Sequence, residues 1–311
     1  MATMNRSDIF CADLSLEVGM PMIGTAPVVD AWFLLEYDGP WTAKATSDNN
    51  LPQPVQDWLA GAVEMAGRGR LQFIKQKQTA SRPGFAFFVA LAREINPLLY
   101  EFHFESYDHL LSLDLSGLLA GESGVRQNPR TEPLYLVCTN GKRDRCCSRL
   151  GLTLYKALDE RVGADAWQCT HLGGHRFAPT MVTFPGGTCY GRLTPADLAP
   201  LVTTQSQDEL LLTHLRGRSC YEQVVQAADW FLRQETGLPG RDAYRLLDAR
   251  PIDETQWAIR FAAPATGEIY RLLLSQTMSD AAYMVSCSPA KSKPLPQFNL
   301  ISMKKEDHAP V

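Results

Sequence analysis

The sequence lacks a dominant charge, a long apolar run and a Cys-x-x-Cys motif, and each absence excludes a class of protein. Among 311 residues, 30 Lys and Arg stand against 34 Asp and Glu, so a net charge of −4 provides no broad basic surface for nucleic acid. The longest unbroken apolar stretch, residues 85–92, is far too short to span a bilayer. Without Cys-x-x-Cys, thiol–disulfide exchange of the thioredoxin type is not expected.

Residues 1–7 are polar and contain no apolar core, so they do not have the pattern of a signal peptide. We therefore expect a cytoplasmic protein whose cysteines are reduced thiols, with neither membrane nor nucleic acid as a partner. Apolar residues make up 45% of the chain and charged residues 21%, a balance that favours a folded protein over a disordered one.

Hydrophobic periodicity predicts a strand–helix–strand unit in the first 125 residues, followed by two further strands and a Leu-rich helix. The predicted strands are 32–36, 71–77, 85–91 and 100–104, and the predicted helices are 54–67 and 108–119. Pro52 and Pro54 suit the start of the first helix, and Gly67 and Gly69 suit its end. Residues 120–133, rich in Gly, Asn, Pro and charge, are predicted to be a linker.

The same order of elements then recurs over residues 130–215. Predicted strands at 134–138 and 167–170 enclose a helix at 147–162, and short strands at 181–184 and 188–192 precede a helix near Pro195. Strand, helix, parallel strand and then a hairpin is thioredoxin-like topology. We therefore predict an α/β fold with either two tandem thioredoxin-like units, at 1–125 and 130–215, or one such unit beside an unrelated α+β domain.

Residues 216–311 are predicted to form a small C-terminal α+β extension. A helix at 221–236 is followed by strands at 244–249, 257–261 and 269–274, and Gly237 and Pro239 end the helix. The last dozen residues are polar, so we expect them to be frayed.

Cysteine and histidine concentrate in one segment. Five of the eight cysteines and two of the six histidines lie between Cys138 and Cys189, and all of them except Cys189 fall in the fragments CTNGKRDRCCS (138–148) and CTHLGGHRFA (169–178). In the predicted topology, these are the loops that leave two neighbouring parallel strands at the same edge of the sheet. Two thiols and two imidazoles are thus expected to converge on one metal centre.

The spacing of these residues favours a cluster over a single ion. Cys138 and its partner, Cys146 or Cys147, are too far apart in sequence for a zinc knuckle, whose paired ligands are separated by two to four residues. Such a long loop suits a [2Fe–2S] cluster, and two thiolates with two imidazoles are the Rieske set of ligands. Gly173 and Gly174 disfavour a helix between His171 and His175 and suit a tight loop.

The chain resembles the sucrase/ferredoxin-like family in these two loops, most specifically in HLGGHRFA, and in CADLSLEVGMPMIGTA (11–26), WFLLEYDGPW (32–41) and RGRSCYEQVVQAAD (216–229). The resemblance implies a thioredoxin-like [2Fe–2S] ferredoxin domain that transfers single electrons. Its cysteine pair maps onto Cys138 and Cys147, with Cys146 as the alternative, and its histidine pair onto His171 and His175. Cluster and metal ligands are therefore expected to be Cys138, Cys147, His171 and His175.

Three other functions stay open: a structural Cys2His2 zinc module; a reductase that uses the cluster on an unidentified substrate; and sucrose cleavage, which the family name implies although no pair of carboxylates suited to glycoside hydrolysis stands out. Cys11, Cys189, Cys220 and Cys287 are expected to be buried or half-buried thiols, and Cys169 is expected to pack beneath the site. The segment 138–193 carries eight basic and four acidic residues. Lys142, Arg143 and Arg176 flank the ligand loops, so we expect them to attract a redox partner, either an acidic protein or a flavoprotein reductase.

Overall fold

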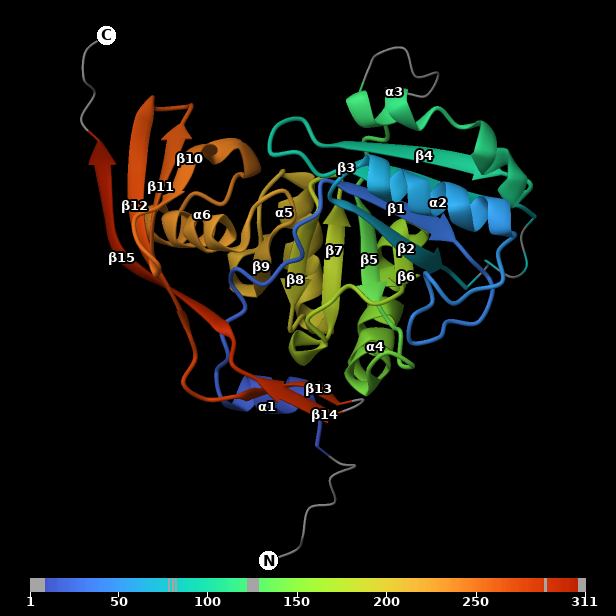
Figure 1. Ribbon diagram of the computed structural model, residues 1–311, viewed down its shortest axis with the longest axis horizontal. Coiled ribbons are helices and arrows are strands. Elements are labelled where there is room, and N and C mark those ends of the chain that lie inside the picture. The colour runs from blue at the N-terminus through green and yellow to red at the C-terminus, as the bar shows by residue number, and fades with distance from the viewer. Residues whose placement is uncertain are drawn as a thin grey trace, which may run out of the picture.

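A nine-stranded mixed sheet forms the centre of the molecule, in the order β4-β3-β1-β2-β6-β5-β7-β8-β9 (Figure 1). The computed structural model describes residues 9–77, 79, 81, 83–121, 129–287 and 290–306. The strands are β1 (Ala31–Glu36), β2 (Gly69–Lys75), β3 (Phe85–Leu91), β4 (Leu98–Phe104), β5 (Leu134–Cys138), β6 (Ala166–Cys169), β7 (Thr180–Phe184), β8 (Thr188–Gly191) and β9 (Leu215–Arg218). The predicted α/β class is confirmed.

Both halves of this sheet are connected in the same way. In the first half, helix α2 (Gln53–Met65) joins the parallel strands β1 and β2, β3 pairs antiparallel with β1, and β4 pairs antiparallel with β3. In the second half, helix α4 (Arg145–Val162) joins the parallel strands β5 and β6, and β7 and β8 follow in the same arrangement. The halves meet where β2 and β6 pair antiparallel, with Ile74 opposite Cys169.

The core lies on both faces of the sheet, which explains why its strands are continuous apolar runs. On one face the two halves pack against each other: the Trp32 and Phe184 rings lie 5.5 Å apart, and the Phe88 and Trp167 rings 5.6 Å apart. On the other face, α2 covers the first half, while α4 and α5 (Leu198–Ser206) cover the second. The two halves are therefore held together both by buried side chains and by the pairing of β2 with β6.

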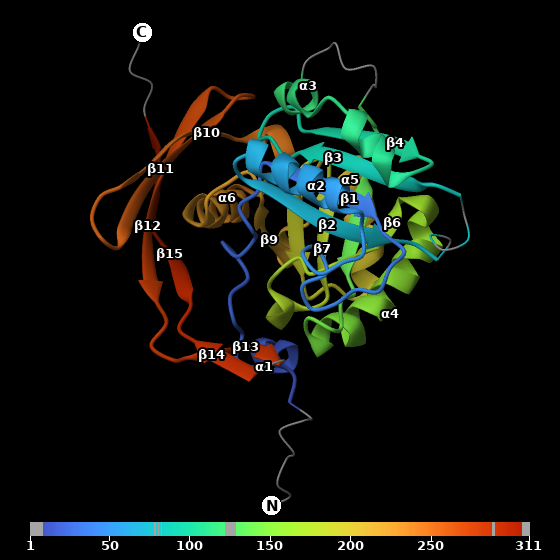
Figure 2. The same ribbon diagram turned by 45° about the vertical axis from the view of Figure 1, so that its right-hand side comes forward.

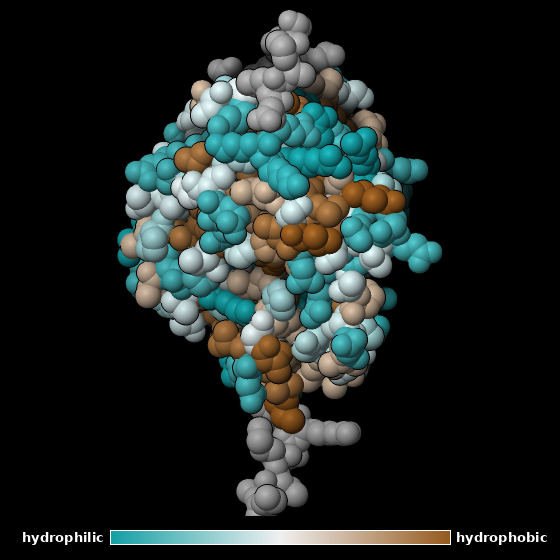
Figure 3. Space-filling model, turned by 90° about the vertical axis from the view of Figure 1, so that its left-hand side faces the viewer, coloured by the Kyte–Doolittle hydropathy of each residue, from teal (hydrophilic) through white to brown (hydrophobic). Residues whose placement is uncertain are grey.

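The C-terminal part is a helix packed on a separate antiparallel sheet. Helix α6 (Gln223–Thr236) covers the sheet β10-β11-β12-β15, made of β10 (Arg245–Pro251), β11 (Gln256–Ala263), β12 (Glu268–Met278) and β15 (Pro296–Glu306). Figure 3 views the molecule from this side, where hydrophobic side chains are interspersed among hydrophilic ones. Ile301 on β15 is 50% exposed.

The predicted fraying of the last dozen residues is wrong for residues 300–306, which belong to β15 and pair along β12. Ion pairs secure this end of the strand: Lys305 Nζ lies 2.6 Å from Glu268 Oε1, and Arg260 Nη2 lies 2.8 Å from Glu306 Oε2. The sequence predicts a tail here because polar residues alternate along β15, whose outer face is solvated. Residues 307–311 lie outside the described part of the chain.

Shorter elements complete the fold. Helix α1 (Cys11–Glu17) lies beside the hairpin of β13 (Tyr283–Cys287) and β14 (Ala290–Lys293) in both ribbon views (Figures 1 and 2). The predicted helix at 108–119 is instead two pieces, η2 (Tyr107–Ser112) and α3 (Leu115–Ala120), because the Asp114 side chain caps a new helix start. Among the residues that the structure describes, the further short 3-10 helices are η3 (Gly163–Asp165), η4 (His175–Phe177), η5 (Pro195–Asp197), η6 (Leu212–His214) and η7 (Arg241–Ala243).

Half of the predicted linker at 120–133, residues 122–128, lies outside the described part of the chain; residues 129–133 belong to no helix or strand, whereas Ala120 ends α3. Across the described ranges, no helix combines the length and apolar character needed to cross a membrane.

Candidate metal centre

Three of the four expected ligands converge where β5 and β6 end. Cys138 is the last residue of β5, Cys147 lies in the first turn of α4, and His171 follows β6 by two residues. Because β5 and β6 are parallel neighbours, their carboxyl ends meet at one edge of the sheet. The two Sγ atoms and one ring nitrogen of His171 all lie within 4.8 Å of one another.

His175, the fourth expected ligand, lies next to this group. It is the first residue of η4, and its ring centroid is 5.0 Å from that of His171. Its Nε2 atom also lies 3.4 Å from Oδ2 of Asp144, the residue that caps α4. Cys146, the alternative to Cys147, is turned away from the group and lies against Cys11 and Cys287.

A glycine allows α4 to approach the end of β5. A Cβ atom on Gly151 would lie 2.2 Å from the Cys138 carbonyl oxygen, far inside van der Waals contact, and the clashing atom belongs to the backbone. The close packing of α4 on β5 therefore depends on this glycine, and that packing sets the separation of Cys138 and Cys147.

We expect Gly151→Ala to move α4 away from β5, to lower the free energy of unfolding by about 1–3 kcal/mol and to reduce metal content. Chemical denaturation and metal analysis measure the two effects. Gly61→Ala is the matched control, since a Cβ atom on that helical glycine of α2 meets nothing within 4 Å. It should leave metal content unchanged and raise stability by about 0.4–1 kcal/mol. Equal behaviour of the two variants would contradict the packing argument.

Electrostatics favour the metal-binding forms of Cys138 and His175, whereas Cys138 and burial raise the pKa of Cys147 well above its ordinary value. Interaction with Cys147 and with His171 keeps the pKa of the Cys138 thiol well below its ordinary value, although burial opposes this. Burial lowers the pKa of His175, so its imidazole is neutral and has a free lone pair at neutral pH. Burial acts to raise the pKa of Asp144, but N–H groups of Cys287 and Cys146 outweigh it and hold that pKa below its usual range. Thiolate and neutral imidazole are the forms that bind metal.

Comparison with known proteins supports the resemblance noted in the sequence. The sequence profile of the sucrase/ferredoxin-like family matches residues 22–217, more than half of the chain. The chain belongs to this family. It is also 33% identical over 98 residues to altered inheritance of mitochondria protein 32 of Meyerozyma guilliermondii, a match that spans 28% of this chain and 35% of that relative. No solved structure matches the chain.

Two arginines that the sequence analysis did not select hold the histidine loop in place. Arg70 Nη2 donates to the His171 carbonyl oxygen at 2.7 Å, and Arg216 Nη1 donates to the Gly173 carbonyl oxygen at 3.1 Å. Burial lowers the pKa of both guanidinium groups, while nearby thiols, including that of Cys138, oppose the shift. Arg216 lies within the family segment RGRSCYEQVVQAAD, which was the available signal for it; Arg70 had none.

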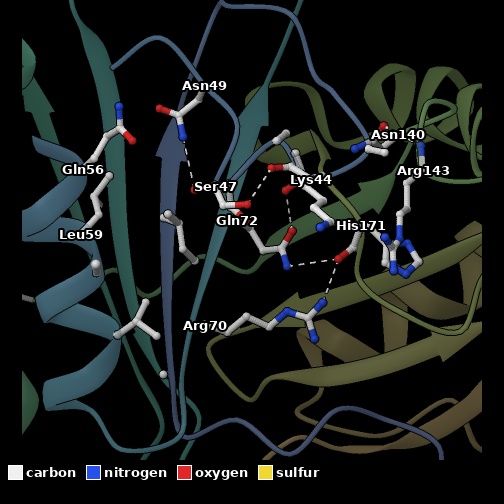
Figure 4. A pocket seen from close by; sticks show the side chains of 18 of the residues that line it. Lys44, Ser47, Asn49, Gln56, Leu59, Arg70, Gln72, Asn140, Arg143 and His171 are labelled. Atoms are coloured by element: carbon white, nitrogen blue, oxygen red, sulfur yellow. Dashed lines mark hydrogen bonds between the residues drawn. The ribbon is translucent and has the colours of Figure 1, made fainter. Parts of the chain in front are cut away.

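An open cavity of about 730 Å³ gives access to His171. The cavity is lined by Lys44, Arg70 and Arg143 together with His171 and Asn140. Figure 4 shows Arg70 reaching toward the backbone of His171, and Arg143 lying beside His171. Three cationic side chains stand against the single carboxylate of Asp57, so the cavity is basic. It adjoins Cys138, Cys147 and His171, as an entry point for a negatively charged molecule would.

The three cations expected to attract a partner differ in position. Lys142 and Arg143 are exposed, whereas Arg176 is half-buried with its guanidinium 4.4 Å from the centre of the Phe177 ring. Burial lowers the pKa of Arg176 to about 10.

Cys169 is fully buried in the same core cluster as Cys138, and burial raises the pKa of the Cys169 thiol well above the ordinary value. A neutral, buried Cys169 is a packing residue in this arrangement.

Proposed function

We propose that this protein carries single electrons on a [2Fe–2S] cluster bound by Cys138, Cys147, His171 and His175. The observation that supports it best is the convergence of two thiols and one imidazole from three separate segments, with a second imidazole 5.0 Å from the first. Two sulfur and two nitrogen ligands are the donor set of a Rieske-type centre. Membership of the sucrase/ferredoxin-like family is in keeping with this function.

The chemistry of the donors fits such a group. The Nδ1 atom of His171 is buried and has no hydrogen-bond partner among the residues that the structure describes. Leaving a buried polar atom unsatisfied is costly, and a metal bond to the ring would remove this cost. When bound, a [2Fe–2S] cluster accepts and returns one electron.

The fold also supports the thioredoxin-like interpretation. The orders β2-β1-β3-β4 and β6-β5-β7-β8 are the same, with the same parallel and antiparallel pairings. We interpret residues 1–125 and 130–215 as tandem thioredoxin-like units, only the second of which contributes the metal ligands, and 216–311 as a C-terminal extension.

Surrounding residues have defined roles in this proposal. Arg70 and Arg216 fix the loop from His171 to Gly174 by its carbonyl groups, and their positive charges favour an anionic state at Cys138. The two positive charges would therefore stabilise the reduced cluster, which carries one more negative charge than the oxidised cluster. The cavity lined by Lys44 and Arg143 would admit the acidic group of a redox partner.

Electron paramagnetic resonance and redox titration of protein purified without oxygen test the proposal. We expect a spectrum only after reduction, with a lower average g value than that of a four-cysteine cluster, and a midpoint potential in the Rieske range of roughly −150 to +300 mV. In His175→Cys a thiolate replaces a neutral imidazole, so the average g value should rise and the potential should fall. A midpoint near −400 mV in the wild type, typical of four thiolates, would contradict the histidine ligands.

Reversing the exposed cations should slow electron exchange with an anion. In Lys142→Glu with Arg143→Glu, oxidation of the reduced protein by ferricyanide should slow on the order of tenfold at low ionic strength and much less at high salt. Stopped-flow absorbance measures the rate. Lys156→Glu with Arg161→Glu makes the same change of charge on exposed residues nearer the other end of α4 and should have a smaller effect. Equal slowing by both double variants, or slowing that ignores salt, would contradict attraction at the site.

A single zinc ion at the same residues is the second candidate. The three ligand atoms within 4.8 Å of one another are compact enough for one ion, and Cys2His2 is a common structural zinc set. Zinc is colourless, so visible absorption of the purified protein separates the two candidates.

A further inference from the structure

A second group of cysteines lies next to the first and uses none of its ligands. Cys11 begins α1, Cys146 lies in the first turn of α4, and Cys287 ends β13, so three distant segments each contribute one buried thiol. The Cys11 and Cys146 Sγ atoms are 3.6 Å apart, and those of Cys146 and Cys287 are 3.5 Å apart. One carboxylate oxygen of Asp144 completes a set of four atoms that all lie within 4.8 Å of one another.

These separations match a tetrahedral metal site better than a disulfide. Zinc–sulfur bonds of about 2.3 Å at tetrahedral angles place two sulfur atoms about 3.8 Å apart. A disulfide would require about 2.05 Å, and it would leave the third thiol without a role. Three sulfur ligands with one oxygen or nitrogen ligand suit zinc, which prefers four ligands in this geometry.

Backbone N–H groups and a nearby cation surround the four ligand atoms, as is usual around bound metals. The Cys11 backbone N–H donates to Cys287 Sγ at 3.0 Å, a contact that stabilises a thiolate. The Asp144 side chain is fixed by N–H groups of Cys146 and Cys287, at 3.0 and 2.8 Å. Arg176, half-buried, is close enough to Cys11 for their charges to interact, so it would offset part of the negative charge of three thiolates and a carboxylate.

We propose that Cys11, Asp144, Cys146 and Cys287 bind one structural Zn²⁺ ion. Cys11 and Cys287 lie outside residues 22–217, the segment that matches the family profile, so this site would join segments from both ends of the chain to the family core. Helix α1 packs on both η4 and β13, and Asp144 faces His175. The ion would thus fasten α1 and the β13–β14 hairpin beside the loop that carries His171 and His175. The proposal concerns residues apart from the first group, and the zinc content expected below is for a first group that holds iron and not zinc.

Metal analysis of protein grown with added zinc and purified without oxygen tests the site. We expect about one zinc per chain in the wild type and in Cys138→Ser, and loss of that zinc in Cys11→Ser and in Cys287→Ser. Cys220→Ser, which changes a half-buried cysteine away from the group, is the matched control and should retain zinc. Zinc X-ray absorption of the wild type should show three sulfur neighbours near 2.3 Å and one oxygen neighbour near 2.0–2.2 Å.

Several results would overturn the proposal. Wild-type protein without zinc, or with an intact mass showing a disulfide between two of these cysteines, would do so. Zinc that disappears in Cys138→Ser but stays in Cys11→Ser would assign the ion to the first group instead. Absorption data with two nitrogen neighbours would lead to the same conclusion without any variant, which keeps the test decisive even where Cys11→Ser or Cys287→Ser fails to fold.

Discussion

Cys138→Ser is expected to yield protein without iron, acid-labile sulfide or visible absorption. Among the proposed ligands, Cys138 has the most favourable electrostatics: it is completely buried, its pKa lies well below the ordinary value through Cys147 and His171, and the buried Arg216 and the half-buried Arg70 are close by. A serine hydroxyl at this position would stay protonated and would bind iron weakly. Iron and sulfide content and the absorption spectrum of protein purified without oxygen measure the loss.

Cys169→Ser is a stringent control for this substitution. Cys169 lies directly opposite Cys138 in the pairing of β5 and β6, is equally buried and belongs to the same core cluster. Its replacement has the same steric cost in the same place, yet Cys169 is outside the ligand group within the described residues. We expect iron to stay bound. Loss of iron from both variants would show that general damage to the core, and not ligation, accounts for the effect.

Asp229→Ala is expected to lower the free energy of unfolding by about 3–5 kcal/mol. On α6, Asp229 Oδ1 accepts from Arg233 Nε at 2.9 Å, and the two side chains are 2% and 0% exposed. Arg233 also donates to the carbonyl oxygens of Leu238 and Gly240, which follow the helix. Removing the carboxylate would leave a guanidinium charge buried without its counterion, and this is far more costly than losing a surface ion pair.

Urea or guanidinium denaturation of the full chain measures this change. Glu235→Ala removes a carboxylate from an exposed position on the same helix and should change stability by no more than about 0.5 kcal/mol. The metal content of Asp229→Ala should remain at the wild-type level, because α6 packs on the C-terminal sheet. A loss below about 1 kcal/mol would mean that water reaches Arg233 and replaces the carboxylate.

Strands with strong apolar runs were predictable from the sequence. Residues 85–91 and 134–138 were predicted with the bounds that β3 and β5 have, because buried strands leave an unbroken hydrophobic signal. β15 was not, since its exposed face carries polar residues and its paired residues in β12 lie from 18 positions (Met278 and Pro296) to 37 positions (Ile269 and Glu306) earlier in the chain. No local pattern distinguishes such a strand from a tail.

At the candidate site, too, contacts that follow from the order of elements were predictable from the sequence, whereas contacts between distant segments were not. The loops with Cys138 and His171 could be brought together because the parallel pairing of β5 and β6 follows from the order of elements. The choice between Cys146 and Cys147 could not be made, because neighbouring helical residues point about 100° apart and the sequence does not say which direction faces the histidines. The contact of Cys11 with Cys287 spans 276 positions and leaves no local signal.

The pairing of β2 with β6 has a consequence for any attempt to work alone with the half that carries the proposed ligands. A fragment excised from about residue 130 would lose β2, and the backbone groups of β6 that it satisfies would become available to other chains. The same cut would bare Trp167 and Phe184, which pack on Phe88 and Trp32. We therefore expect such a fragment to self-associate and to be insoluble. In the full chain, the N-terminal half keeps these surfaces of the second half away from solvent and from other chains.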